Sequence, residues 1–220
     1  MIRPVAGAEN TVPSLELHLT AKSGINVSEV LSDYPDVKDA LFERLDPRRP
    51  GGSLVLITGG AGNGKTTTAM AIIEDVASRV ASSEKPLRVA HVGLVEHLYS
   101  RAISIRNGDD ESCLLGEGVT APVIFYDQFS GRSGKMAFEA LSMAMAGRKV
   151  IGVINGKSAQ DGVDRLRQLL AGFGVGASFL DDLIDTGRVF SVYQTVRCAE
   201  ASQSLSGNAV STNIREEGKE

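Results

Sequence analysis

Ser53-Leu-Val-Leu-Ile-Thr-Gly-Gly-Ala-Gly-Asn-Gly-Lys-Thr66 is the stretch that decides the fold of this chain. Its apolar part, 54–58, predicts a buried strand, and the amphipathic run 65–80 predicts a helix. The eight residues from Gly59 to Thr66 join the two and match the pattern G-x-x-x-x-G-K-[ST] in full. Because strand, loop and helix agree, we favour a phosphate-binding loop over a chance glycine-rich turn.

The chemistry expected of this loop follows from its residue types. Glycines let the backbone turn tightly, so that successive N–H groups point inward at phosphate oxygens, and the following helix adds its positive end. Lys65 supplies an ammonium for the β- and γ-phosphates, and the Thr66 hydroxyl is suited to hold Mg²⁺. We therefore expect ATP with Mg²⁺ as the ligand. The predicted nucleotide-binding residues are Gly59, Gly60, Ala61, Gly62, Asn63, Gly64, Lys65, Thr66 and Thr67.

Besides the Thr66 hydroxyl, an acidic residue is needed to anchor the ligand shell of the magnesium ion. Such a residue normally ends a buried strand beside the loop. Val123-Ile-Phe-Tyr-Asp127 offers Asp127, whose alternative interpretation is a solvated carboxylate at a strand end. The next position is often a Glu that activates the attacking water. Here it is Gln128, which cannot accept a proton as a carboxylate can, so we expect slow hydrolysis.

The rest of the chain alternates apolar strands with amphipathic helices. This alternation predicts an α/β fold of the P-loop NTPase (RecA-like) class, with a mostly parallel sheet covered by helices on both faces. Besides 54–58, strands are expected at 15–20 on a sheet edge, 87–92, 119–126, 150–154 and 189–196. Helices are expected from 36 to about 46, and at 65–80, 133–146 and 158–170. We divide the chain into an N-terminal extension of strand and helix (1–50), a P-loop ATPase domain (51–201) and a disordered tail (202–220).

Composition bounds the function. The 220 residues are 42% hydrophobic and carry a net charge of −4, so no overall basic field supports binding to nucleic acid. No leader peptide and no apolar run long enough to span a membrane is evident. Cys113 and Cys198 lie far apart without metal or redox spacing, which fits a reducing cytoplasm.

Two further groups of residues are candidates for a function. His91 and His97 flank a turn with Glu96 beside them, but without a third spaced ligand we favour ordinary core or surface histidines. Arg101 and Arg106 could reach the γ-phosphate of a neighbouring subunit, and a solvated basic face is at least as good an explanation.

The chain resembles the motor domain of the secretion and pilus ATPases, which include type II and type IV secretion, pilus retraction and conjugative-transfer ATPases. The resemblance rests on Gly51-Gly-Ser-Leu-Val-Leu-Ile-Thr-Gly59, on Gly64-Lys-Thr-Thr-Thr68, on Gly147-Arg-Lys-Val-Ile-Gly-Val-Ile-Asn155 with Ser158-Ala159 and Asp164-Arg-Leu166, and on Val192-Tyr-Gln-Thr-Val196. It implies a ring-shaped hexamer with ATP between subunits, docked at the cytoplasmic side of membrane-embedded secretion or pilus machinery.

The departures from that family concern catalysis. Its catalytic Glu falls on Gln128 and the His of its histidine box falls on Asn155, so we assign catalytic positions to Lys65, Gln128 and Asn155. Its acidic residues are expected near Val92 and Gly93, and of that region only Val95-Glu96 resembles the pattern. With only about fifty residues before the loop, we expect this chain to lack the large N-terminal domain of the family.

Several functions therefore compete. The first is a motor ATPase for secretion, pilus dynamics or conjugative DNA transfer, and the second is a nucleotide-binding switch or assembly subunit that scarcely hydrolyses. A DNA-dependent ATPase or helicase loader would need a basic groove or stacking aromatics, and aromatic residues make up only 5% of the chain. A small-molecule kinase would need an Arg-rich lid, and none is evident.

Overall fold

The computed structural model describes residues 14–21, 35–82, 84–93, 103–108, 120–129, 134–176 and 178–198. Within this part of the chain lie seven strands and five helices. The strands are β1 (Ser14–Ala21), β2 (Ser53–Gly59), β3 (Leu87–Val92), β4 (Ile103–Gly108), β5 (Val123–Phe129), β6 (Lys149–Asn155) and β7 (Val189–Cys198). The helices are α1 (Pro35–Leu45), α2 (Lys65–Val80), α3 (Gly134–Met145), α4 (Ala159–Gly172) and α5 (Ser178–Asp185).

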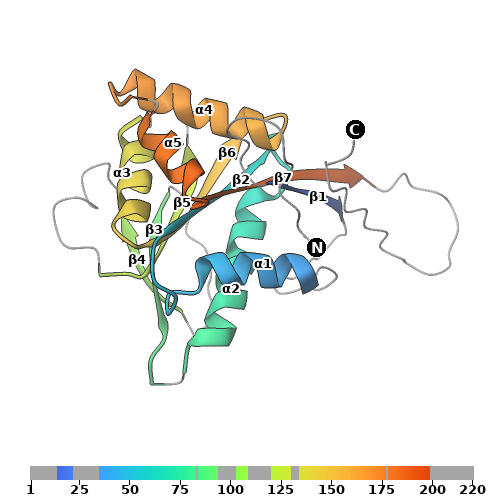
Figure 1. Cartoon of the computed structure of the whole chain (residues 1–220). Coiled ribbons are helices and arrows are strands. Elements are labelled where there is room, and N and C mark those ends of the chain that lie inside the picture. Colours follow the sequence, from blue (N-terminus) through green and yellow to red (C-terminus); the bar gives the residue numbers. More distant parts are fainter. Residues whose placement is uncertain are drawn as a thin grey trace, which may run out of the picture.

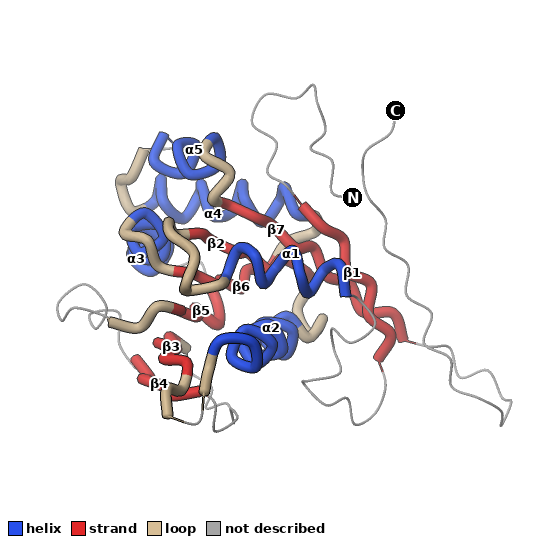
Figure 2. Tube along the Cα trace, turned by 60° about the horizontal axis from the view of Figure 1, so that its bottom comes forward, coloured by secondary structure: helices blue, strands red, loops and turns tan. Residues whose placement is uncertain are grey.

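The strands form one sheet in the order β1-β7-β2-β6-β5-β3-β4, and every strand pair in it is parallel (Figure 1). Helices α1 and α2 cover one face of the sheet, and α3, α4 and α5 cover the other. Figure 2 shows these two groups of helices on opposite sides of the strands. The predicted α/β fold with a parallel sheet between two helical layers is confirmed. Parallel strands end at one edge of a sheet, so the ends of β2, β5, β6 and β7 lie together.

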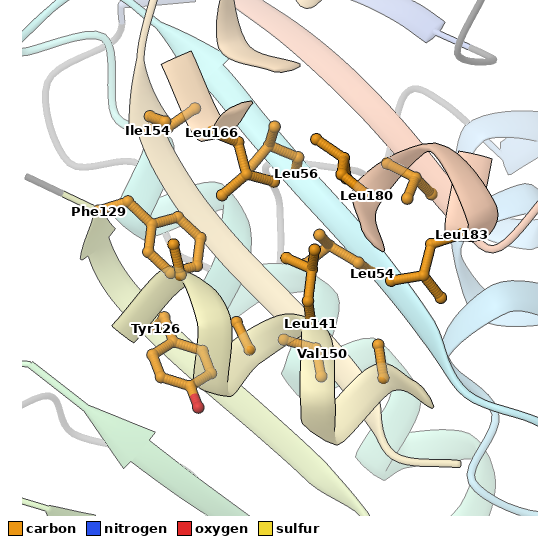
Figure 3. Close-up of a cluster of buried hydrophobic side chains, with 14 of the residues drawn as sticks. Leu54, Leu56, Tyr126, Phe129, Leu141, Val150, Ile154, Leu166, Leu180 and Leu183 are labelled. Atoms are coloured by element: carbon orange, nitrogen blue, oxygen red, sulfur yellow. The ribbon is translucent and has the colours of Figure 1, made fainter. Parts of the chain in front are cut away.

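The two faces of β2 explain why its residues 54–57 are all apolar. Leu54 and Leu56 belong to the core beneath α3, α4 and α5, whereas Val55 and Ile57 belong to the core beneath α1 and α2. Figure 3 shows the first of these cores, in which Leu56 lies beside Leu166 of α4. A strand buried on both faces needs apolar side chains at successive positions, and this produces a continuous apolar run.

Most predicted elements are confirmed within one or two residues, including the edge strand β1 beside β7. Two elements were missed. Strand β4 lies at a sheet edge, and of its six residues, Ile-Ser-Ile-Arg-Asn-Gly, only Ile103 and Ile105 are apolar, so no continuous apolar run marks it. Helix α5 has only eight residues, which is too short for a clear period, although Leu180, Leu183 and Ile184 are all buried.

The predicted strand 119–126 was wrong at both ends. Pro122 has no N–H to donate to a neighbouring strand, and β5 begins only after it, at Val123. At the other end β5 continues past the polar pair Asp127 and Gln128 to Phe129. Polar residues at the end of an apolar run made the strand look finished too early.

A β-bulge in β5 explains this extension. Tyr126 pairs with Gly152 of β6 and Phe129 pairs with Ile154, so two residues, Asp127 and Gln128, lie opposite one. Side chains alternate along a regular strand, and Tyr126 and Phe129 would then face opposite ways. The bulge instead puts both rings in the same core, as Figure 3 shows. Their centroids are 5.5 Å apart. Bulges re-aim side chains beside active sites, and this one lies at the predicted acid and re-aims the two residues that follow it, Gln128 and Phe129.

Candidate functional site: a phosphate-binding loop

The glycine-rich loop lies at the carboxyl edge of the sheet, between β2 and the first residue of α2. Gly62 and Gly64 have φ angles of 78° and 71°. These angles lie in the left-handed region, which residues other than glycine rarely adopt. The turn is closed by a hydrogen bond from the Asn63 N–H to the Gly60 carbonyl, at 3.3 Å. Gly60, Ala61, Gly62 and Gly64 are exposed, so the loop presents its backbone at the surface.

Lys65 is the first residue of α2, and its side chain lies back along the loop. Its Nζ donates to the Gly60 carbonyl at 2.6 Å. The residue is only 7% exposed, and burial lowers the pKa of the Lys65 ammonium below its ordinary value. The ammonium is thus held on the inner side of the predicted phosphate cage. Thr67, the next residue but one, is partly exposed at the same end of α2.

Thr66 and Asp127 are 61 positions apart in sequence, and the fold brings them into contact. The Thr66 hydroxyl donates to Oδ1 of Asp127 at 2.5 Å. Asp127 is 7% exposed and stands on the bulged end of β5, whereas Thr66 stands in the first turn of α2. A hydroxyl and a carboxylate side by side next to a phosphate loop are oxygen ligands of the kind Mg²⁺ prefers.

The other two predicted catalytic residues occupy different places at this edge. Asn155 ends β6 and pairs in register with Gly59, the first residue of the loop, and its side chain is partly exposed. Gln128 follows Asp127 on the bulge and is exposed. The structure thus puts Asn155 beside the start of the loop and turns Gln128 towards solvent.

Gly93 occupies the region where the resembling family carries acidic residues. It follows β3, which pairs with β5. A Cβ atom at position 93 would lie 2.7 Å from Cβ of Asp127 and 3.0 Å from Nε2 of His91. Any side chain there would push against the predicted metal-binding carboxylate. Position 93 therefore has no room for the acidic side chain that the family carries in this region.

His91 is a core residue. It is 3% exposed, and its ring stacks on Phe125 with centroids 4.8 Å apart. Within the described ranges no group of three His, Cys, Asp or Glu side chains could hold a metal ion. His97, Glu96, Arg101 and Cys113 lie outside the described residues, as do the side chains of Arg106 and Cys198.

Gln194 of β7 is the site residue that sequence reasoning missed. It is fully buried, and its Nε2 donates to the main-chain carbonyl of Asn63 in the loop. In return, Nδ2 of Asn63 donates to the Gln194 main-chain carbonyl at 3.2 Å. The sequence does contain a signal for this residue. Phe190 and Val192 lie on one face of β7 and are buried, so the next residue on that face, at position 194, is expected to be apolar, yet it is Gln.

The sheet, its two helical layers and the loop between β2 and α2 define the α/β fold of the P-loop NTPases. No family model matches the sequence, and no curated protein matches it significantly. Solved structures do resemble it. The X-ray structure of the ATPase DotB from Legionella pneumophila has a TM-score of 0.54 and 18% identity, and the match covers 80% of this chain and 48% of that one.

Two further structures match less closely. DotB from Yersinia pseudotuberculosis has a TM-score of 0.46 and 16% identity, covering 69% of this chain and 38% of that one. The VirB11 ATPase of the Brucella suis type IV secretion system, in complex with sulphate, has a TM-score of 0.48 and 15% identity, covering 89% of this chain and 57% of that one. All three are ATPases, and VirB11 belongs to a type IV secretion system, which agrees with the resemblance that the sequence motifs carry. At 18% identity the likeness to the Legionella structure shows the fold alone, and the chain spans about half the length of that protein.

No helix in the described part of the chain is both long and apolar enough to cross a membrane.

Proposed function

We propose that this chain binds ATP with Mg²⁺ and acts as an ATPase of the secretion and pilus type. The observation that carries the proposal is the contact between Thr66 and Asp127, which joins a phosphate loop to a buried acid. A glycine-rich turn alone could be structural. The hydroxyl that follows this turn lies beside a buried carboxylate from a distant strand, and together they supply the two oxygen ligands that hold Mg²⁺ at such loops.

The residues of the chain divide the work of binding. Backbone N–H groups of the loop and the positive end of α2 hold the phosphates. Lys65, now on the Gly60 carbonyl, would turn its ammonium to the β- and γ-phosphates. Thr66 and Asp127 would hold the metal ion. When bound, Mg²⁺ neutralises charge that develops on the β- and γ-phosphate oxygens.

Replacing Asp127 by Asn tests the proposed metal site. Asp127→Asn keeps the size of the side chain but removes the negative charge that would hold a divalent cation. We expect calorimetry to give an affinity for Mg-ATP reduced by about tenfold or more, the loss of one charge-assisted contact. The affinity for ATP in EDTA should stay close to that of the wild type.

The matched control is Asp182→Asn, which removes an exposed carboxylate from α5 on the other side of the sheet. It should leave both affinities unchanged. Equal losses by Asp127→Asn with and without Mg²⁺ would mean that Asp127 supports the loop and not a metal ion.

A second function is favoured by Gln128, which stands where the resembling family has its catalytic Glu. The chain would then be a nucleotide-binding switch or assembly subunit that scarcely hydrolyses. Steady-state phosphate release decides between the two, with Lys65→Ala as the background. A rate orders of magnitude above that background supports the motor, and binding without release supports the switch.

Gln128→Glu carries this comparison further. A carboxylate at position 128 can accept a proton from the attacking water, and such general bases contribute about 10²–10⁴-fold to rates. We expect the variant to raise kcat for phosphate release at saturating Mg-ATP by at least tenfold. Gln168→Glu makes the same change of charge at an exposed position on α4 and should not alter kcat. If both variants release phosphate at the wild-type rate, position 128 does not limit hydrolysis.

The motor proposal includes assembly into a homo-oligomer, and we expect six subunits. This oligomer would dock at the cytoplasmic side of membrane-embedded secretion or pilus machinery. Size-exclusion chromatography with light scattering, with and without Mg-ATP, tests it. A six-subunit species formed with nucleotide supports the motor, and a persistent monomer counts against it. Stimulation of phosphate release by single-stranded DNA would instead favour a DNA-dependent ATPase.

A further inference from the structure

Gln194 interrupts an apolar row on β7. Side chains of a strand alternate between faces, so residues 190, 192 and 194 point to the face covered by α1 and α2. Phe190 and Val192 are buried there as expected. Gln194 is equally buried, with no exposed surface, although its amide loses contact with water. A polar side chain in such a place needs a hydrogen-bonding reason to be there.

The register of the sheet places this amide against the phosphate loop. Gln194 pairs with Gly59, where β2 ends and the loop begins. Any side chain at position 59 would collide with the Gln194 main-chain carbonyl, so the two backbones approach closely. From this position the side chain reaches the far end of the loop and donates to the Asn63 carbonyl. β7 thus holds the loop at both its first and its fifth residue.

The bond to the Asn63 carbonyl fixes the direction of the next amide. A peptide unit is planar and trans, so its C=O and N–H groups point in opposite directions. With the Asn63 carbonyl turned to Gln194, the Gly64 N–H must point away from β7. Gly64 immediately precedes α2, at the end of the helix where unpaired N–H groups favour anions.

We infer that Gln194 is a positioning residue for phosphate binding: it locks the Asn63–Gly64 peptide so that the Gly64 N–H faces the phosphates of a bound nucleotide. The inference rests on the proposed function. It assigns Gln194 to the phosphates that ATP and ADP share, and not to the base, the metal ion or the attacking water.

The other half of the amide supports this role. Oε1 of Gln194 is buried, and no described residue donates a hydrogen bond to it. A buried acceptor without a donor is unfavourable, and an apolar side chain would fill the same space without that cost. The donor half, on the Asn63 carbonyl, is what distinguishes Gln194 from Leu or Met at this position.

Gln194→Met is the direct test, because methionine has similar length and no donor. We expect the Kd values for Mg-ATP and Mg-ADP, measured by calorimetry, to rise together by about tenfold, the loss of one oriented hydrogen bond. The melting temperature without nucleotide should not fall, because the unpaired Oε1 is removed as well. In the rate of phosphate release the change should appear in KM and not in kcat.

Gln194→Glu supplies a readout that a merely structural role would not move. An ionised carboxylate cannot donate to the Asn63 carbonyl and repels it, so nucleotide affinity should fall further than in Gln194→Met. Burial raises the pKa of a carboxylic acid, and the protonated form has an O–H to donate. Affinity relative to the wild type should therefore recover as the pH is lowered towards 5.

Val192→Ala is the matched control, because it shortens the neighbouring side chain on the same face of the same strand. It should lower the melting temperature and leave both Kd values unchanged. Wild-type affinity in Gln194→Met, or no recovery of Gln194→Glu at low pH, would overturn the inference while nucleotide binding by the wild type stands. A wild-type protein that binds neither nucleotide would instead contradict the proposed function, and the inference would fall with it.

Discussion

Lys65→Ala is expected to reduce the affinity for Mg-ATP by at least 100-fold and to bring phosphate release down to the rate measured without protein. The lysine is the one described side chain of the loop that carries a positive charge, and its Nζ already lies inside the loop on the Gly60 carbonyl. Hydrogen bonds to charged groups contribute about 1.5–3 kcal/mol each. Losing the contacts to two phosphates therefore amounts to two or more factors of ten.

The measurement is calorimetric titration with Mg-ATP, together with steady-state phosphate release. Lys85→Ala is the matched control, since this exposed lysine precedes β3 at the opposite edge of the sheet. It should behave as the wild type. If Lys65→Ala bound Mg-ATP with wild-type affinity, the loop would not be a phosphate-binding loop, and the proposed function would be wrong.

Leu166→Ala is expected to lower the free energy of unfolding by about 2–5 kcal/mol, the largest stability effect we predict. Leu166 lies on the inner face of α4 and is fully buried in the core beneath α3, α4 and α5. In Figure 3 it stands next to Leu56 of β2 and Ile154 of β6. Alanine would leave a cavity under the two strands that carry the loop and Asn155.

Urea denaturation followed by circular dichroism measures this change. Gln168→Ala, at an exposed position two residues further along α4, should shift the midpoint very little. If Leu166→Ala lost less than about 1 kcal/mol, helix α4 would not pack on the sheet as the structure places it.

The phosphate loop could be predicted from sequence because its information is local. The glycines, Lys65 and Thr66 lie within eight consecutive residues, so their relative positions depend only on the local backbone. The flanking strand and helix have clear hydrophobic patterns. Asp127 could be proposed because an acid at the end of an apolar run is also a local pattern. Its contact with Thr66 depends on strand order, which sequence alone did not supply.

The orientation of the residues around Asp127 was not predictable. A β-bulge shifts the alternation of β5 by one residue, so that Phe129 joins the core and Gln128 turns outward. The cause of this shift lies on the neighbouring strand, because the Phe129 ring lies where a side chain at Gly152 of β6 would stand. The sequence of β5 alone does not show that Gly152 of β6 leaves space for the Phe129 ring.

The sequence by itself determined that this chain has a strand, a phosphate loop and a helix in succession, set in an alternation of strands and helices. Only the tertiary structure decided that β7 lies beside β2 and brings the buried amide of Gln194 to the loop. The physical reason is the range of the interactions. Turns and helices are set by neighbours along the chain, whereas the pairing of β2 with β7 depends on contacts between residues more than 100 positions apart.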